Sequence, residues 1–82
     1  MPVATHEEIR EIIVGIAEVD PAEVGDDTPL RQALAVDSLM VLEIMSAIEN
    51  RYQIKIPDEK AKEFTTVSAI VVALASATPA NA

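Results

Sequence analysis

Three segments of this chain repeat aliphatic residues at the spacing of one face of an α-helix, and this pattern constrains the fold more than any other feature. In each segment the apolar side chains recur at i, i+3, i+4 and i+7, which places them on one stripe of a helix. The stripes are Ile9, Ile12, Ile13 and Ile16; Val41, Ile44, Met45, Ile48 and Tyr52; and Val67, Ile70, Val71 and Leu74. Three helices that each bury one stripe predict an all-α fold, a small helical bundle.

Local signals predict where these helices begin and end. Thr5 with Glu8 three residues later is typical of a capping box. Asp20-Pro21 should end the first helix, because a residue before proline avoids helical geometry. The second helix should run over residues 38–52, and the third should start near Thr66, a residue type that caps helices.

The connections are uneven in length. Residues 20–37 form a long connection between the first and second helices, with a short helical turn expected around Leu30 to Leu34. Residues 53–56 read as extended without a convincing strand partner, and residues 76–82 as a disordered tail. The expected architecture is three main helices plus one short helix, in a single domain spanning residues 1–82.

Composition excludes several classes of function. The chain has 82 residues and no cysteine, so it has neither disulfides nor a thiolate zinc site. Fourteen acidic residues against six basic ones give a net charge of −8, which disfavours nucleic acid and anionic membranes. Without a signal peptide or a membrane-spanning run, we expect a cytoplasmic protein. Met1 and the short ends favour a free-standing protein, and we expect a monomer.

An enzyme would need converging acid, base or nucleophilic groups, and few are present. The one histidine, His6, falls on the opening turn of the first helix, where a solvated surface residue is the better interpretation. Gly15 and Gly25 are the only glycines, so there is no glycine-rich phosphate loop, and no metal-ligand spacing occurs. We therefore predict a non-catalytic protein without a resident metal.

Asp37-Ser38-Leu39 is the candidate functional sequence. Aspartate and serine at a helix start usually accept hydrogen bonds from free backbone N–H groups, so a capping role is the first interpretation. At 100° per residue, however, Leu39 and Met40 fall beside the serine on the side opposite the buried stripe. Exposed apolar groups next to a reachable hydroxyl suggest a contact surface around an attachment point.

The segment Leu34-Ala35-Val36-Asp37-Ser38-Leu39 resembles the serine signature of acyl carrier proteins. The resemblance spans roughly residues 5–75, because later segments also sit at the spacing of that family. These segments are Ala47-Ile48-Glu49-Asn50-Arg51-Tyr52, Ile54-Lys55-Ile56-Pro57-Asp58-Glu59 and Phe64-Thr65-Thr66-Val67.

The resemblance implies a function for each part of this region. Ser38 would receive 4′-phosphopantetheine from coenzyme A through a phosphopantetheinyl transferase, with Asp37 contributing to the magnesium site of that reaction. The terminal thiol would carry acyl groups as thioesters. Ketosynthases, acyltransferases or acyl ligases with basic or apolar docking patches would read the second helix. The residues expected to contact these partners are Leu39, Met40, Glu43, Ala47 and Glu49.

Three residues depart from the family pattern, and they bear on the local backbone and on the kind of carrier. Ala35 stands where the family usually has glycine, so either the backbone there avoids positive φ or it carries strain. Met40 and Asn50 replace acids common in fatty-acid carriers, which favours a discrete carrier of a polyketide pathway. An aminoacyl or peptidyl carrier is the alternative with the same chemistry, and an unmodified helical interaction module is the alternative from another class.

Overall fold

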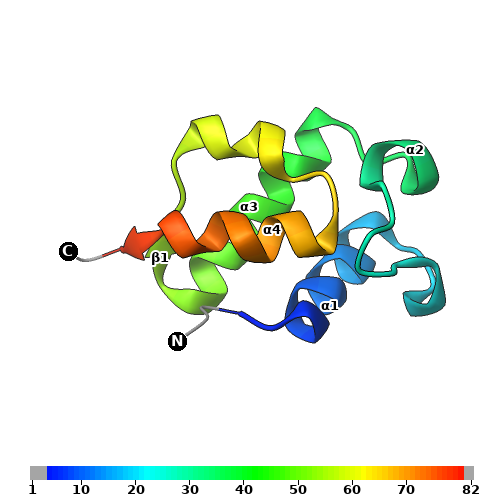
Figure 1. Ribbon diagram of the computed structural model, residues 1–82, viewed down its shortest axis with the longest axis horizontal. Helices are drawn as coiled ribbons and strands as arrows, with labels where there is room; N and C mark the ends of the chain where they lie inside the picture. Colours follow the sequence, from blue (N-terminus) through cyan, green and yellow to red (C-terminus); the bar gives the residue numbers. More distant parts are fainter. Residues whose placement is uncertain (1–3, 81–82) are drawn as a thin grey trace.

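The computed structural model describes residues 4–80, which form a bundle of helices joined by turns (Figure 1). The α-helices are α1 (His6–Ala17), α2 (Leu30–Leu34), α3 (Ser38–Tyr52) and α4 (Val67–Ala73). The shorter elements are the 3-10 helices η1 (Pro21–Glu23), η2 (Asp58–Glu63) and η3 (Leu74–Ser76), and the strands β1 (Ile54–Lys55) and β2 (Thr78–Pro79). The prediction of three main helices plus one short helix is confirmed.

Helix α1 begins as the sequence predicts and ends earlier. The Thr5 hydroxyl accepts from the Glu8 N–H at 3.2 Å, and the Glu8 carboxylate accepts from the Thr5 N–H at 3.1 Å. That backbone bond holds the pKa of Glu8 below its ordinary value of 4.5. The predicted end at Asp20-Pro21 is wrong, because Glu18 turns into the left-handed region at φ 56° and closes the helix after Ala17.

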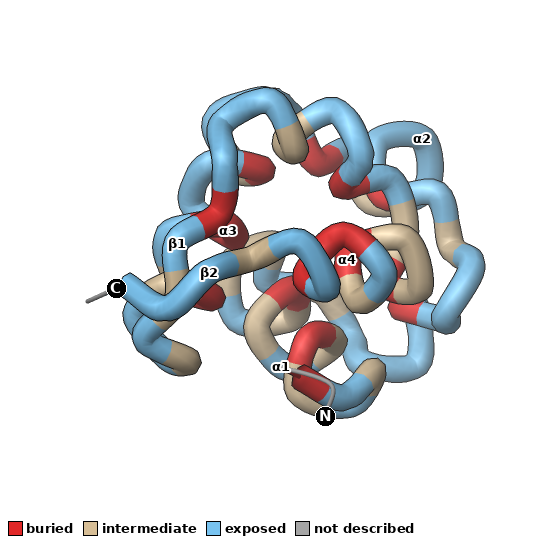
Figure 2. Tube along the Cα trace, turned by 60° about the vertical axis from the view of Figure 1, so that its left-hand side comes forward, coloured by how far each residue is buried: buried red, intermediate tan, exposed pale blue. Residues whose placement is uncertain are grey.

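One contiguous hydrophobic core, mostly aliphatic with Phe64, joins the helices, and α1 packs against both α3 and α4. The tube in Figure 2 marks buried positions on all three helices and on the connection before α3. From that connection Val24, Leu30 and Val36 reach the core with 2% exposure or less. Sequence periodicity missed Val24 and Val36, because no helical repeat surrounds them. No helix within residues 4–80 has the length and apolar character to cross a membrane.

A short sheet ties the end of the chain to the residues after α3. Strand β1 pairs antiparallel with β2, with Ile54 opposite Pro79 and Lys55 opposite Thr78. The Ala80 N–H adds a bond to the Gln53 carbonyl at 3.1 Å. The sequence suggested neither this pair nor order beyond residue 76, because two-residue strands carry no periodic signal. Residues 81–82 of the expected tail lie outside the described residues.

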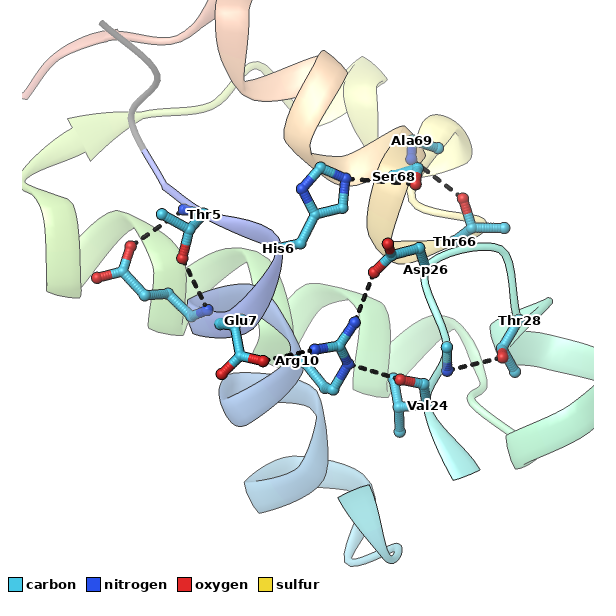
Figure 3. A network of polar contacts seen from close by, with 12 residues as sticks. Thr5, His6, Glu7, Arg10, Val24, Asp26, Thr28, Thr66, Ser68 and Ala69 are labelled. Atoms are coloured by element: carbon cyan, nitrogen blue, oxygen red, sulfur yellow. Dashed lines mark hydrogen bonds and ion pairs between the residues drawn. The ribbon is translucent and has the colours of Figure 1, made fainter. Parts of the chain in front are cut away.

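A polar network fixes the connection that leads to Ser38 (Figure 3). The Arg10 Nε donates to the Val24 carbonyl at 2.6 Å, and its Nη2 pairs with the Asp26 carboxylate. The Asp26 carbonyl in turn accepts from the Ser68 N–H at 3.0 Å. One arginine on α1 therefore links the connection to α1, and Asp26 extends that link to α4.

Candidate functional site

Ser38 is the first residue of α3, and its side chain faces solvent. The neighbouring Asp37 has extended backbone angles and caps the helix, because its Oδ1 accepts from the Met40 N–H at 2.9 Å. The side chain that satisfies the helix start is thus Asp37, which leaves the Ser38 hydroxyl free of a capping role. Because Asp37 caps the helix, capping does not explain why residue 38 is a serine.

The turn before Ser38 has a strained backbone. Ala35 caps the C-terminus of α2 in the left-handed region, with φ 54° and ψ 33°. The next residue, Val36, is buried and donates to the Leu30 carbonyl at 3.2 Å. Of the two alternatives for Ala35, the structure shows the strained one, since this conformation costs a non-glycine residue roughly 1–2 kcal/mol.

Arg31 is a candidate site residue that no sequence motif or periodic pattern indicates. Its Nη2 lies 3.3 Å from the Ser38 Oγ and donates to it, which joins α2 to the start of α3. The signal that could have revealed it is local: residues 28–36 contain one charged residue, Arg31, in a strongly acidic chain.

The predicted partner face beside Ser38 is only partly exposed. Leu39 is 66% exposed, as expected, and Glu43 is also exposed. Met40 was expected to point outward, and this is wrong: it is half-buried and packs against the core. Leu42, three residues after Leu39 on the same helix, is 51% exposed and forms an apolar patch with it.

Farther along α3, residues of the predicted partner face pack against or bind other parts of this protein. Ala47 and Glu49 are both half-buried. The Glu49 Oε2 accepts from the Ile56 N–H at 2.8 Å, so this carboxylate holds the chain that follows β1. An acid engaged in this way is less available to a basic patch than Glu43 is.

His6 lies away from Ser38. It sits on α1 with its Nε2 3.4 Å from the Ser68 hydroxyl on α4 (Figure 3). Across residues 4–80, no three His, Asp or Glu side chains come together as ligands for a metal ion. The structure therefore brings together Ser38, Asp37 and Arg31, with Leu39 beside them.

The sequence of this chain is similar to those of known proteins. A family model described as a phosphopantetheine attachment site matches residues 7–74. An acyl carrier protein of Streptomyces coelicolor is 42% identical over 77 residues, covering 93% of this chain and 84% of that protein. The chain belongs to the acyl carrier protein family. Acyl carrier proteins of Wolinella succinogenes and Treponema denticola are 37% and 46% identical, covering 83% and 72% of this chain and 90% and 76% of those proteins.

Membership makes the chain a non-catalytic carrier with a covalently attached 4′-phosphopantetheine, modified by a phosphopantetheinyl transferase. The residues at the start of α3 fit a phosphate of that kind. In the part of the chain that the structure describes, the N–H groups of Ser38 and Leu39 have no hydrogen-bond partner. With the Arg31 guanidinium they form a set of donors around an exposed hydroxyl. Such donors suit an acyl carrier protein's phosphodiester.

Proposed function

We propose that Ser38 is the residue that carries the 4′-phosphopantetheine. The observation that carries this proposal is the exposed hydroxyl at the first residue of α3, which has no capping role because Asp37 caps the helix. In the transfer, the Ser38 Oγ loses its proton and bonds to the phosphorus of coenzyme A. The phosphoanhydride bond breaks, and adenosine 3′,5′-bisphosphate leaves. The bound group supplies a terminal thiol that holds acyl groups as thioesters.

Asp37 has two roles in this proposal. Its Oδ1 caps α3, which holds the Ser38 hydroxyl at a fixed place. Its charge also contributes to the magnesium site of the transferase reaction, because carboxylate oxygens are ligands that Mg²⁺ prefers.

The cargo is an acyl chain of a polyketide or related pathway, including pathways to antibiotics. Support comes from Met40 and Asn50, which stand where fatty-acid carriers commonly have acids, and from the exposed Leu39 and Leu42. Ketosynthases, acyltransferases or acyl ligases would then dock partly by apolar contact, with Glu43 meeting a basic residue. Such docking gives orientation and fast release, which suit a shuttle.

One carrier domain, monomeric and cytoplasmic, completes the proposal. The family match over residues 7–74 and the single core of the described residues support the one domain. The monomeric state and the compartment are carried over from the expectations drawn from the sequence. An aminoacyl or peptidyl carrier is the competing function, because it uses the same serine chemistry.

Loading assays separate these two functions. The protein is first modified with coenzyme A, magnesium and a broad-specificity phosphopantetheinyl transferase, and is then offered acyl and aminoacyl donors with their loading enzymes. We expect a thioester with the acyl donors alone. A fatty-acid ketosynthase should extend acyl groups on this protein poorly compared with groups on its own carrier. Equal use would contradict the polyketide assignment, and aminoacyl loading would contradict the acyl assignment.

A further inference from the structure

Arg31 differs from the other arginines of this protein in its contacts. Within residues 4–80, Arg10 and Arg51 form ion pairs with acids, whereas Arg31 forms none. Its one side-chain hydrogen bond goes to the Ser38 hydroxyl, which is a neutral acceptor at the long distance of 3.3 Å. A guanidinium has five N–H donors and no acceptor, so most of its hydrogen-bonding capacity is unused here.

Modification of Ser38 changes this contact from neutral to charged. The non-bridging oxygens of a phosphodiester on Oγ are bonded to the phosphorus next to the atom that Arg31 already contacts. Guanidinium groups bind phosphate through two parallel N–H···O bonds, which are roughly twice as strong as neutral hydrogen bonds. Arg31 is on the short helix α2, so such a pair would connect the arm to α2 as well as to α3.

The charges around Ser38 also favour a contact between Arg31 and a phosphate. The new phosphodiester would add a negative charge next to the Asp37 carboxylate, in a chain whose net charge is already −8. The free N–H groups of Ser38 and Leu39 offset part of that repulsion. Arg31 supplies the only full positive charge between residues 28 and 36, and it lies on the serine side of α2.

We propose that Arg31 is a positioning residue that pairs with the phosphate of the arm on Ser38 and restricts the direction in which the arm leaves the protein. This inference rests on Ser38 being the attachment site. It predicts a property of the modified protein that does not depend on which cargo or partner enzyme is used.

The test is phosphorus NMR of fully modified protein, with Arg31→Gln compared with Lys55→Gln. Both changes remove one positive charge from an exposed position. Lys55 follows α3, whose far end lies roughly 20 Å from Ser38 at 1.5 Å per residue. We expect Arg31→Gln to shift the phosphodiester signal and Lys55→Gln to leave it unchanged. Added salt should move the unsubstituted protein's signal toward that of Arg31→Gln.

A second measurement reports on the arginine itself. The Nε–H signal that disappears in Arg31→Gln identifies Arg31, and this signal should shift when Ser38 is modified. Full modification with the same phosphorus signal in both variants, or with an unmoved Arg31 signal, would overturn the pairing and leave the attachment site intact. Absence of any mass gain in the unsubstituted protein would instead overturn the proposed function, and this inference with it.

Discussion

At the residue scale, the start of α3 assigns different tasks to adjacent side chains. Asp37 satisfies the backbone of the helix, Ser38 presents a hydroxyl, and Arg31 approaches that hydroxyl from α2. The sequence pointed to Asp37 and Ser38 through a familiar motif. Arg31 was hidden because a contact between residues seven apart, across a turn, follows no helical or strand period.

The capping role of Asp37 can be separated from the role of its charge. Asp37→Ala should lower the free energy of unfolding by about 1 kcal/mol, because the Met40 N–H loses its acceptor. Asp37→Asn should cost less, since asparagine caps as well as aspartate. Urea denaturation measures both. If the Asp37→Asn protein is stable yet modified more slowly by the transferase, the carboxylate charge acts in the reaction; equal stability losses in the two variants would contradict the cap.

Ala35 provides a prediction of increased stability. Ala35→Gly should raise the free energy of unfolding by up to about 1 kcal/mol, because glycine adopts φ 54° without the clash of a Cβ. Ala33→Gly, two positions earlier and inside α2, is the matched control and should instead lower stability by up to about 1 kcal/mol. Opposite signs in urea denaturation support the strain at residue 35, and two losses would refute it.

At the scale of elements, the sequence predicted the helices that carry a periodic apolar repeat, and it missed the features that no repeat accompanies. Helix α3 has the predicted bounds, and Thr66 caps α4 through the Ala69 N–H at 3.0 Å. The early end of α1 at Glu18 depends on one left-handed residue without a glycine signal. The β1–β2 pair depends on tertiary contact between two-residue segments, which no local pattern encodes.

Arg10 should stabilise the connection between α1 and α2 more than Arg51 stabilises its surroundings. Arg10→Met should lower the free energy of unfolding by about 2 kcal/mol, since its guanidinium serves a carbonyl and a carboxylate while only 22% exposed. Arg51→Met is the control, because its ion pairs at 3.6 and 3.8 Å are solvent-exposed and worth at most about 1 kcal/mol. Hydrogen exchange at the Ser68 amide should accelerate in the Arg10 variant alone. Equal effects of the two variants would argue against the network.

At the scale of the whole molecule, the surroundings of Ser38 differ in character from the acidic chain as a whole. The chain is strongly acidic, yet the residues around Ser38 combine Arg31 with the exposed Leu39 and Leu42. A partner that approaches Ser38 therefore meets apolar surface and the Arg31 guanidinium beside the exposed carboxylates of Asp37 and Glu43. The sequence predicted the outward Leu39, but it could not tell that Met40 packs against the core or that Glu49 is occupied by Ile56.

Two exposed apolar residues allow a matched test of this partner surface. Leu39→Gln should leave the free energy of unfolding within about 0.5 kcal/mol, because Leu39 is 66% exposed. It should raise the KM of the phosphopantetheinyl transferase for the protein about tenfold, equal to about 1.4 kcal/mol of lost binding. Val72→Gln on α4 alters a side chain that is 72% exposed and should change neither quantity. A similar KM for the two variants would place the transferase contact elsewhere.

Ser38 as the attachment site is tested by the intact mass of the protein after incubation with coenzyme A, magnesium and a phosphopantetheinyl transferase. Ser38→Ala is compared with Ser46→Ala, which removes another exposed hydroxyl from the same helix. We predict that the unsubstituted protein and Ser46→Ala each gain the mass of one phosphopantetheine, and that Ser38→Ala gains nothing. A modified Ser38→Ala protein, or a folded unsubstituted protein that gains no mass, would contradict Ser38 as the attachment site.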